Sequence, residues 1–178
     1  MNYSDPDELF PIVDENGNKI GEAKRSVCHN GKSMLLHPVV HLHLFNSKGE
    51  LFLQKRSESK DIQPGKWDTS VGGHVGREES VEDALRREAN EELGLTGINP
   101  HFLKRYIWES PRERELVYSF SAISDKQPEI NLDEIETGRF WSQSEIIAQI
   151  GNNIFTPNFA SEFNMLFISP DTAIKNSE

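Results

Sequence analysis

The sequence predicts a mixed α/β fold in which strands outnumber helices. Segments with the alternation of a strand and segments with the spacing of a helix follow one another in mixed order, and no segment repeats. The length of 178 residues fits one domain with a substantial core. We therefore expect a single domain over residues 1–178, with an N-terminal hairpin region at about 9–36, a core at about 37–168 and a frayed tail at 171–178.

The first half of the chain predicts two hairpins and a short strand. Residues Leu9 to Ala23 hold two apolar runs around a turn rich in Asp and Asn. Residues Val39 to Lys55 hold the runs VVHLHLF and ELFLQKR around the turn Asn-Ser-Lys-Gly. A short strand is expected from Trp67 to Val71, leading into a glycine loop at 72–73, where the missing Cβ permits close approach or positive φ.

The second half predicts three further strands and two helices. The strands are expected at Phe102 to Glu109, Leu116 to Ile123 and Gly138 to Trp141. One helix is expected from Ser142 to about Ile150. A final amphipathic helix is expected from Thr156-Pro157 to about Ile168, with proline at its first helical position.

Composition indicates a small soluble protein. The net charge of −10 and the isoelectric point near 5.1 argue against a nucleic-acid or anionic-membrane surface. The single cysteine, Cys28, excludes an intramolecular disulfide and fits a reducing compartment. No signal peptide is apparent, and no apolar run approaches 18 residues, so a cytoplasmic protein is expected.

A helix that carries clustered acids is predicted after Ser80. Ser80 can cap its first turn, which is rich in acids, and Gly94 is a suitable residue at its end. In this frame Glu88, Glu91 and Glu92 lie at positions i, i+3 and i+4. Their carboxylates therefore share one face of the helix.

These acids destabilise a helix unless a cation binds them. Like charges at such spacings repel by roughly 0.2–0.5 kcal/mol per pair. The helix dipole disfavours anions in the last turn by a further ~0.3–1 kcal/mol. A bound divalent cation reverses the sign of both effects, and hard carboxylate oxygens suit Mg²⁺ or Mn²⁺. The alternative is an acidic helix end that is simply solvated.

The stretch GGHVGREESVEDALRREANEELGL, residues 72 to 95, fills every fixed position of G-x5-E-x7-R-E-U-x-E-E-x-G-U and so resembles the Nudix box. The resemblance implies an α/β/α sandwich with a mixed central sheet and, here, an N-terminal β-hairpin extension. It also implies a metal-dependent hydrolase, with Mg²⁺ or Mn²⁺ as cofactor, that cleaves a diphosphate linked to another moiety.

By this resemblance each fixed position has a role. Arg87 is expected to orient the carboxylates, and Glu79 to be an outer or late metal ligand rather than a base. The expected metal ligands are Glu88, Glu91, Glu92 and the backbone carbonyl of Gly72.

A narrower resemblance covers most of residues 10 to 168. The segments PIVDENGNKIGEAKRSVCH, HLHLFNSKGELFLQKRS and SKDIQPGKWDTSVGGHV are similar to the Nudix branch that contains type I isopentenyl diphosphate isomerases. That branch implies a second metal site, whose imidazole and carboxylate ligands suit Mn²⁺, Mg²⁺ or Zn²⁺. Whether the site forms stays open. The matching residues are His29, His37, His74, Glu113 and Glu115.

Two departures argue against isomerase chemistry. The isomerases place a cysteine immediately before the Gly-His pair, and this chain has Gly72 there. They also place a tryptophan after the Thr-Pro near the C-terminus, and this chain has Asn158. The scaffold therefore resembles the isomerases, whereas the intact box resembles the hydrolases.

Hydrolysis also requires a general base for the attacking water. The loop at 132–138 lies where Nudix enzymes often place such a glutamate, although a solvated acidic loop explains its composition equally well. Glu134 is the first candidate, Glu136 the second and Glu115 the third. The expected catalytic group is Glu92, Glu91, Arg87 and Glu134.

Three functions are consistent with the sequence. The first is a Nudix pyrophosphohydrolase acting on a nucleoside-diphosphate-type or related small molecule. The second is an isopentenyl diphosphate isomerase-like enzyme, and the third is a non-catalytic Nudix ligand-binding module. The sequence carries no readable motif for the substrate. Nudix proteins often form homodimers, and that analogy is the basis for expecting one here.

Overall fold

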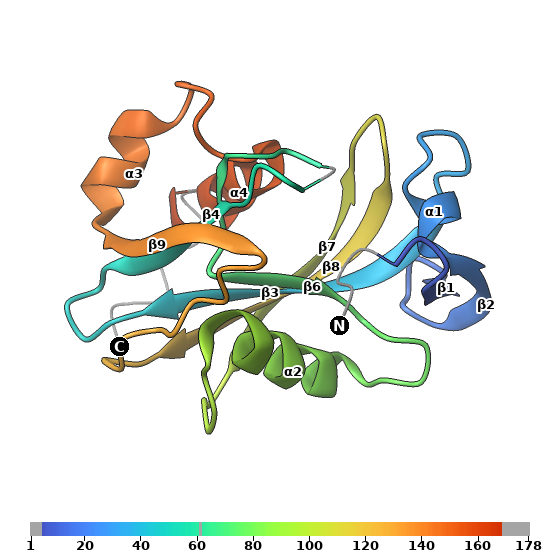
Figure 1. The fold of residues 1–178 in the computed structure, drawn as a ribbon, viewed down its shortest axis with the longest axis horizontal. Coiled ribbons are helices and arrows are strands. Elements are labelled where there is room, and N and C mark those ends of the chain that lie inside the picture. The colour runs from blue at the N-terminus through green and yellow to red at the C-terminus, as the bar shows by residue number, and fades with distance from the viewer. Residues whose placement is uncertain (1–4, 61, 169–178) are drawn as a thin grey trace.

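A seven-stranded mixed sheet forms the centre of the molecule (Figure 1). The computed structural model describes residues 5–60 and 62–168, so the predicted tail at 171–178 lies outside the described residues. The main strand order is β5-β4-β3-β8-β7, with β6 paired to β3 and β9 paired to β4. The strands are β3 (Leu36–Phe45), β4 (Leu51–Arg56), β5 (Trp67–Asp68), β6 (Val71–His74), β7 (His101–Glu109), β8 (Arg114–Ile123) and β9 (Ile135–Trp141).

Strand β3 runs through the middle of the sheet. It pairs with β8 in parallel along its whole length and with β6 antiparallel from Val39–His74 to Leu42–Val71. Layers cover both faces of the strand, so all its residues except Phe45 are buried. The histidines of β3 are therefore buried as well, and each requires a partner inside the protein.

Helices pack on both faces of the sheet, which confirms the predicted α/β/α arrangement (Figure 1). Helix α2 (Val81–Leu93) lies on one face and buries Ala84, Leu85 and Ala89 against strand residues such as Val40. On the other face, α3 (Gln143–Gln149) and α4 (Pro157–Phe163) enclose a second apolar cluster. That cluster comprises Leu51, Leu53, Trp141, Ile146, Phe155, Phe159 and Phe163.

The helices begin where the sequence predicts. The side chains of Ser80, Ser142 and Thr156 accept hydrogen bonds from backbone N–H groups of the first turns of α2, α3 and α4. Gly94 ends α2 in the left-handed conformation with φ of 63°. The predicted last helix changes to a π-helix, η1 (Asn164–Ile168), for its final residues. Within the described part of the chain, no helix has both the length and the apolarity needed to cross a membrane.

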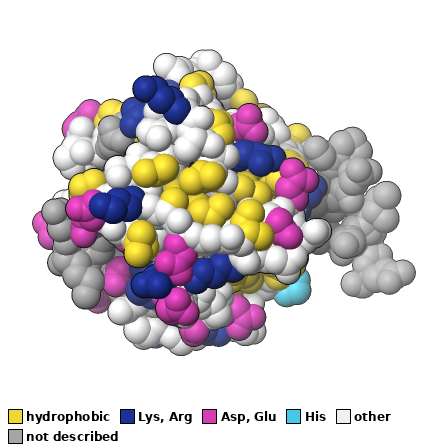
Figure 2. Space-filling view, turned by 90° about the vertical axis from the view of Figure 1, so that its right-hand side faces the viewer, with side chains coloured by type: hydrophobic (Ala, Val, Ile, Leu, Met, Phe, Trp, Pro, Cys, Tyr) yellow, Lys and Arg dark blue, Asp and Glu magenta, His cyan; other side chains and the backbone are white. Residues whose placement is uncertain are grey.

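The N-terminal hairpin forms as predicted, from β1 (Leu9–Val13) and β2 (Lys19–Lys24), and is followed by the short helix α1 (Arg25–Cys28). Strand β1 is buried after its first residue, whereas β2 is almost entirely exposed. Figure 2 views the molecule from this end and shows apolar side chains in the middle of the face with charged ones around them. The hairpin therefore packs inward through β1.

The second predicted hairpin is only partly correct. Strands β3 and β4 are joined by the expected turn, but they pair only at Phe45 and Leu51 and then diverge. Strand β4 instead pairs with β9 over most of its length. The divergence lets each strand pair with other partners on both sides, which leaves fewer unpaired backbone groups inside the sheet.

The predicted glycine loop at 72–73 is wrong. Both glycines lie in β6, where Gly72 pairs with His41 and Gly73 with Val40, and neither has positive φ. A glycine is still required at position 73, because a Cβ there would collide with the carboxyl group of Glu88. The glycine therefore permits close packing of α2 on β6 rather than a special backbone conformation.

Candidate active site

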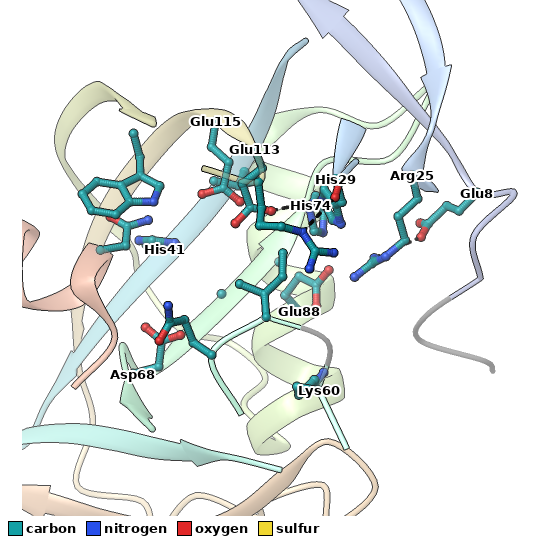
Figure 3. Close-up of a pocket in the computed structure, with 18 of the residues that line it drawn as sticks. Glu8, Arg25, His29, His41, Lys60, Asp68, His74, Glu88, Glu113 and Glu115 are labelled. Carbon is teal, nitrogen blue, oxygen red and sulfur yellow. Dashed lines mark hydrogen bonds and ion pairs between the residues drawn. The ribbon is translucent and has the colours of Figure 1, made fainter. Parts of the chain in front are cut away.

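One open cleft of about 1510 Å³ collects most of the predicted site residues. It lies over β3 and β6 and is bordered by the acidic face of α2, the ends of β7 and β8, the start of α4 and the segment before β1. Figure 3 shows His41 and Asp68 at one end of the cleft and Arg25 and Glu8 at the other. His29, His74, Glu113, Glu115 and Glu88 lie between these ends.

The acidic residues of α2 turn toward the cleft together. Glu92 is only 4 % exposed and accepts hydrogen bonds from Gln54 Nε2 at 2.9 Å and from the Gly72 N–H at 3.2 Å. Burial raises the pKa of Glu92 to about 8, and the nearby Glu88 and Glu134 add to this shift. Burial likewise raises the pKa of Glu88 to about 7. The carboxylates are thus crowded and are incompletely neutralised by the protein groups around them.

Arg87 contacts three acids at once. Its guanidinium donates to Glu79 at 2.8 Å, to Glu88 at 2.7 Å and to Glu91 at 3.2 Å. It also donates to the backbone carbonyl of His74 at 3.0 Å. This fork of donors holds α2 against the end of β6, which is the geometry expected of a residue that orients carboxylates.

Glu79 is tied to the edge of the cluster. Besides Arg87, it accepts a hydrogen bond from the Gly76 N–H at 2.9 Å. Both interactions stabilise the carboxylate form, and although burial opposes them the pKa of Glu79 is lowered. The Glu79 carboxylate is therefore already paired at the edge of the cluster, and its role as an outer or late metal ligand stays a prediction.

The three candidate bases occupy different environments. Glu134 lies just before β9, is buried and lines the cleft. Its Oε2 accepts from Lys60 Nζ at 2.8 Å, while its Oε1 is buried without a hydrogen-bond partner among the described residues. Glu136 is exposed, pairs with Lys55 at 2.8 Å and does not line the cleft. Glu115 lines the cleft, where burial raises its pKa to about 8.

The five residues of the predicted second metal site converge. The ligand atoms of His29, His37 and His74 all lie within 4.8 Å of one another, and the same holds for His37 with Glu113 and Glu115. The Nε2 atoms of His29 and His74 are 3.2 Å apart, and His29 Nε2 lies 3.4 Å from Glu113 Oε2. The donor set therefore has the imidazole and carboxylate composition that a transition-type divalent cation prefers.

The hairpin holds these histidines in place and helps to keep them neutral. The ring of Phe10, from β1, stacks on His74 with a centroid distance of 4.2 Å and lies 5.5 Å from the ring of His37. Burial lowers the pKa of His29 to about 3 and that of His37 to about 4, and it holds the pKa of His74 well below its usual value. Neutral imidazoles are the form that binds metal.

The two departures from the isomerases lie in the same cleft. Gly72 and Asn158 both line it, and the hydroxyl of Tyr106 donates to Asn158 Oδ1 at 2.8 Å. Cys28 is fully buried beside Phe10, does not line the cleft, and has its pKa raised by burial to about 11. Among the described residues, therefore, no thiol faces the cleft.

Sequence reasoning did not identify several residues that shape the site. Gln54 contacts Glu92, and Lys60 contacts Glu134, but neither stands in a pattern that distinguishes it from a surface residue. His41 lines the cleft and pairs with Glu162 of α4 at 2.8 Å. The alternation HLHLF placed His41 and His43 on one face of a strand, which was the available signal for a buried pair.

This fold and this acid-rich cleft define a class of enzyme that uses divalent metal to cleave phosphorus-containing anhydrides. The family model described as NUDIX domain matches residues 35–162. The chain belongs to the Nudix family and is a Nudix pyrophosphohydrolase.

The relatives confirm the isomerase-like branch. An uncharacterised Nudix hydrolase of Streptomyces coelicolor is 31 % identical over 92 % of this chain and 90 % of its own. Isopentenyl-diphosphate Delta-isomerase 1 of Photorhabdus laumondii is 33 % identical over 88 % of this chain and 93 % of its own. Among solved structures, protein DR0079 of Deinococcus radiodurans has a TM-score of 0.77 at 26 % identity, covering 90 % of this chain and 99 % of that one.

Proposed function

We propose that this protein hydrolyses a diphosphate linkage in a nucleoside-diphosphate-type or related small molecule, by attack of water on phosphorus. The observation that carries the proposal is the position of Glu134. It brings a buried, partly unpartnered carboxylate to the cleft that the acids of α2 line. A proton acceptor and a cation site thus share one cleft.

The residues of α2 fit a hard divalent cation. Crowded carboxylates with raised pKa values are stabilised by such a cation, and oxygen donors suit Mg²⁺ or Mn²⁺. A cation bound there polarises a phosphoryl group and lowers the pKa of a bound water. The proposed ligands are Glu88, Glu91, Glu92 and the carbonyl of Gly72.

The histidine and glutamate cluster fits a second cation. Its ligand atoms already lie within 4.8 Å of one another, and its imidazoles are held neutral by burial. We propose His29, His37, His74, Glu113 and Glu115 as this second set.

Basic side chains at the cleft offset the negative charge of a diphosphate. Arg25 lines the cleft and lies 3.6 Å from Glu8, a loose pair that a phosphate group can replace. Lys60 lines it beside Glu134. We assign the phosphate end of the substrate to this part of the cleft.

Glu134 then takes the proton of the attacking water. Lys60 holds one of its oxygens, and the other is left without a protein partner among the described residues. Arg87 keeps the acids of α2 in position, and Gln54 fixes Glu92. Water bound between Glu134 and the phosphoryl group meets a base that is already oriented.

The isomerase alternative has one observation in its favour, the assembled histidine cluster that the resemblance to isomerases implies. Two others oppose it, because Gly72 provides no thiol and Asn158 provides no aromatic face. A non-catalytic binding module would not require a free carboxylate oxygen at Glu134. Hydrolysis is therefore the better-supported function.

The test is release of phosphate or pyrophosphate by the purified protein. The panel comprises nucleoside diphosphates, nucleoside triphosphates, sugar nucleotides and prenyl diphosphates, each with Mg²⁺, with Mn²⁺ and with EDTA. We expect at least one compound to be hydrolysed and EDTA to abolish the reaction. Absence of release from the whole panel, in protein that binds metal by calorimetry, would support the binding module instead.

A further inference from the structure

The end of the cleft away from Arg25 is lined by polar side chains that are hydrogen-bonded to one another. Figure 3 shows His41 and Asp68 there, on the far side of Glu113 and Glu115 from Arg25. Tyr106 and Glu162 complete it together with Asn158. We call the set His41, Tyr106, Asn158 and Glu162 the polar pocket. None of its members belongs to the Nudix box, and the hydrolysis described above uses none of them.

A buried carboxylate anchors the polar pocket. Glu162 of α4 has no exposed surface, and its Oε2 accepts from His41 Nδ1 at 2.8 Å. Its other oxygen lies 3.2 Å from His43 Nε2 without a well-directed hydrogen bond. Because His41 comes from the central strand and Glu162 from the last helix, this contact fixes the orientation of the His41 ring.

Two hydrogen-bonding groups remain for a ligand. His41 uses Nδ1 for Glu162, and its Nε2 has no partner among the described residues. Asn158 uses Oδ1 for the Tyr106 hydroxyl, so the N–H groups of its amide have none there either. Both residues line the cleft. A hydrocarbon group bound here would remove water from these groups and offer no hydrogen bond in return.

The charges around the pocket exclude a phosphate. The carboxylates of Glu162, Asp68 and Glu115 all act electrostatically on His41, and Glu162 contacts it directly. Asp68 is neutralised in part by Arg56 at 3.0 Å, but the set of acids outnumbers the bases around His41. A further anion would be repelled by these carboxylates, whereas an uncharged polar group with oxygen acceptors would not.

We propose that the polar pocket binds the non-phosphate half of the substrate through hydrogen bonds from Asn158 and His41, and that it selects an oxygen-rich group such as a sugar or nucleoside over a prenyl chain. The proposal rests on the proposed hydrolase function and adds the substrate class to it. The specificity-determining residues are then Asn158 and His41, with Glu162 as the positioning residue.

The first test compares substrates in the wild-type protein. The kcat/KM for a nucleoside diphosphate or a sugar nucleotide is expected to exceed that for dimethylallyl diphosphate by at least ~10²-fold, since a site built for hydrogen bonds rejects partners that lack them. Because a sugar nucleotide carries a nucleoside as well as a sugar, hydrolysis of the nucleoside diphosphate indicates that the nucleoside is recognised, whereas hydrolysis of the sugar nucleotide alone indicates that the sugar is required. Equal or better hydrolysis of dimethylallyl diphosphate would overturn the polar pocket while leaving the hydrolase function intact. Absence of hydrolysis of every compound would overturn the hydrolase function itself.

The second test uses Asn158→Leu, a change at a partly exposed position that should leave the fold intact. We expect it to lower the preference for the better polar substrate over dimethylallyl diphosphate by at least ~10-fold, mainly through KM. Asn164→Leu is the matched control, because Asn164 is exposed on the same helical segment and does not line the cleft. An unchanged preference in Asn158→Leu would contradict the proposal.

A binding measurement separates recognition from catalysis. Titration calorimetry should show weaker binding of the nucleoside monophosphate, or sugar phosphate, to Asn158→Leu and to His41→Asn than to wild type. Inorganic phosphate should bind all three proteins alike, because it lacks the group that the polar pocket contacts. Equal binding of the organic phosphate to all three proteins would place its organic half elsewhere.

Discussion

At the scale of single residues, the roles proposed for the acids of the cleft are separable because the surroundings of these acids differ. Glu92 is buried against Gln54 and the Gly72 N–H, whereas Glu134 keeps one oxygen without a partner among the described residues. Glu136 is occupied by Lys55 at the surface. The same side chain therefore suits a ligand, a base or a surface ion pair, depending on what contacts it.

Replacing a proposed metal ligand should slow turnover and raise the metal requirement. We expect Glu92→Gln to lose at least ~10²-fold in kcat, since metal activation contributes several kcal/mol. Activity measured against Mg²⁺ concentration checks this. Glu82→Gln, an exposed acid on the first turn of α2, is the control and should behave as wild type. Unchanged activity of Glu92→Gln would remove Glu92 from the ligand set.

Replacing the proposed base should slow turnover without a change in metal affinity. Glu134→Gln should lower kcat by ~10²–10⁴-fold, the usual contribution of a general base, with KM and the Mg²⁺ requirement nearly constant. Glu136→Gln is the matched control, because Glu136 lies two residues on but outside the cleft. A loss below ~10-fold in Glu134→Gln would point to Glu115 as the base.

Restoring the missing thiol should not restore isomerisation. A Cβ added at Gly72 meets only ordinary contacts, the nearest being 3.6 Å away, so Gly72→Cys should fold normally. We expect neither the wild type nor this variant to interconvert isopentenyl and dimethylallyl diphosphate, because Asn158 still replaces the aromatic group. Detection of either product by mass spectrometry after chromatographic separation, above a no-enzyme blank, would contradict this.

At the scale of the elements, features that depend on local sequence were predicted better than the pairing of distant strands. The start of α2 at Ser80 and its end at Gly94 follow from capping chemistry, which lies within a few residues of sequence. The divergence of β3 from β4 has no such local signal, because it depends on the pairing of β4 with β9. Arg56 pairs with Ile135, which lies 79 residues further along the chain. The contact of His41 with Glu162, 121 residues apart, has no local signature either.

The same distinction applies to the site. The shared face of the acids of α2 could be predicted because they lie on one helix, and the convergence of the residues proposed as the second metal set could be predicted because a family pattern spans them. Glu134 was a choice among three glutamates, and only tertiary contacts separate them. Lys60 and Gln54 could not be predicted, because a lone Lys or Gln carries no periodic or spacing signal.

The close approach of α2 to β6 gives a test at this scale. Gly73→Ala should destabilise the protein by about 1–3 kcal/mol, because the new methyl group overlaps the Glu88 carboxyl. Thermal denaturation should show a Tm lower by several degrees. Gly21→Ala in β2, where nothing lies within 4 Å of an added Cβ, is the control and should change Tm little. Equal Tm values for both variants would show that the Glu88 side chain or α2 can move aside without cost.

At the scale of the whole molecule, the cleft joins segments from both ends of the chain. Phe10, which lies near the N-terminus, stacks on His74. Glu162, which lies in α4 near the other end, contacts His41. The Glu22 carboxylate also forms an ion pair with Arg77 at 2.9 Å, and this pair links the hairpin to the loop before α2. The site therefore forms only when the described chain has folded as a unit.

Metal should accordingly stabilise the global fold. A cation that binds the folded state alone adds about 2.7 kcal/mol at a concentration 100 times its Kd, so saturating Mg²⁺ or Mn²⁺ should raise Tm by several degrees. The Glu92→Gln variant should lose most of this increase, while its Tm in EDTA should not fall below that of wild type, because one of the crowded charges is gone. A Tm insensitive to both metals in the wild type would contradict the proposed sites.

The central strand β3 also fixes the distance between the proposed second metal set and the polar pocket. His37 and His41 lie on the same face of β3, four residues apart, which at about 3.3 Å per residue separates them by ~13 Å. One belongs to the proposed second metal set and the other to the polar pocket. A molecule that contacts both must therefore reach across that interval, and its organic half must begin at a fixed number of bonds from the phosphorus that is attacked. Inorganic pyrophosphate, which is too short to do so, would occupy one end alone and forfeit the binding energy of the other.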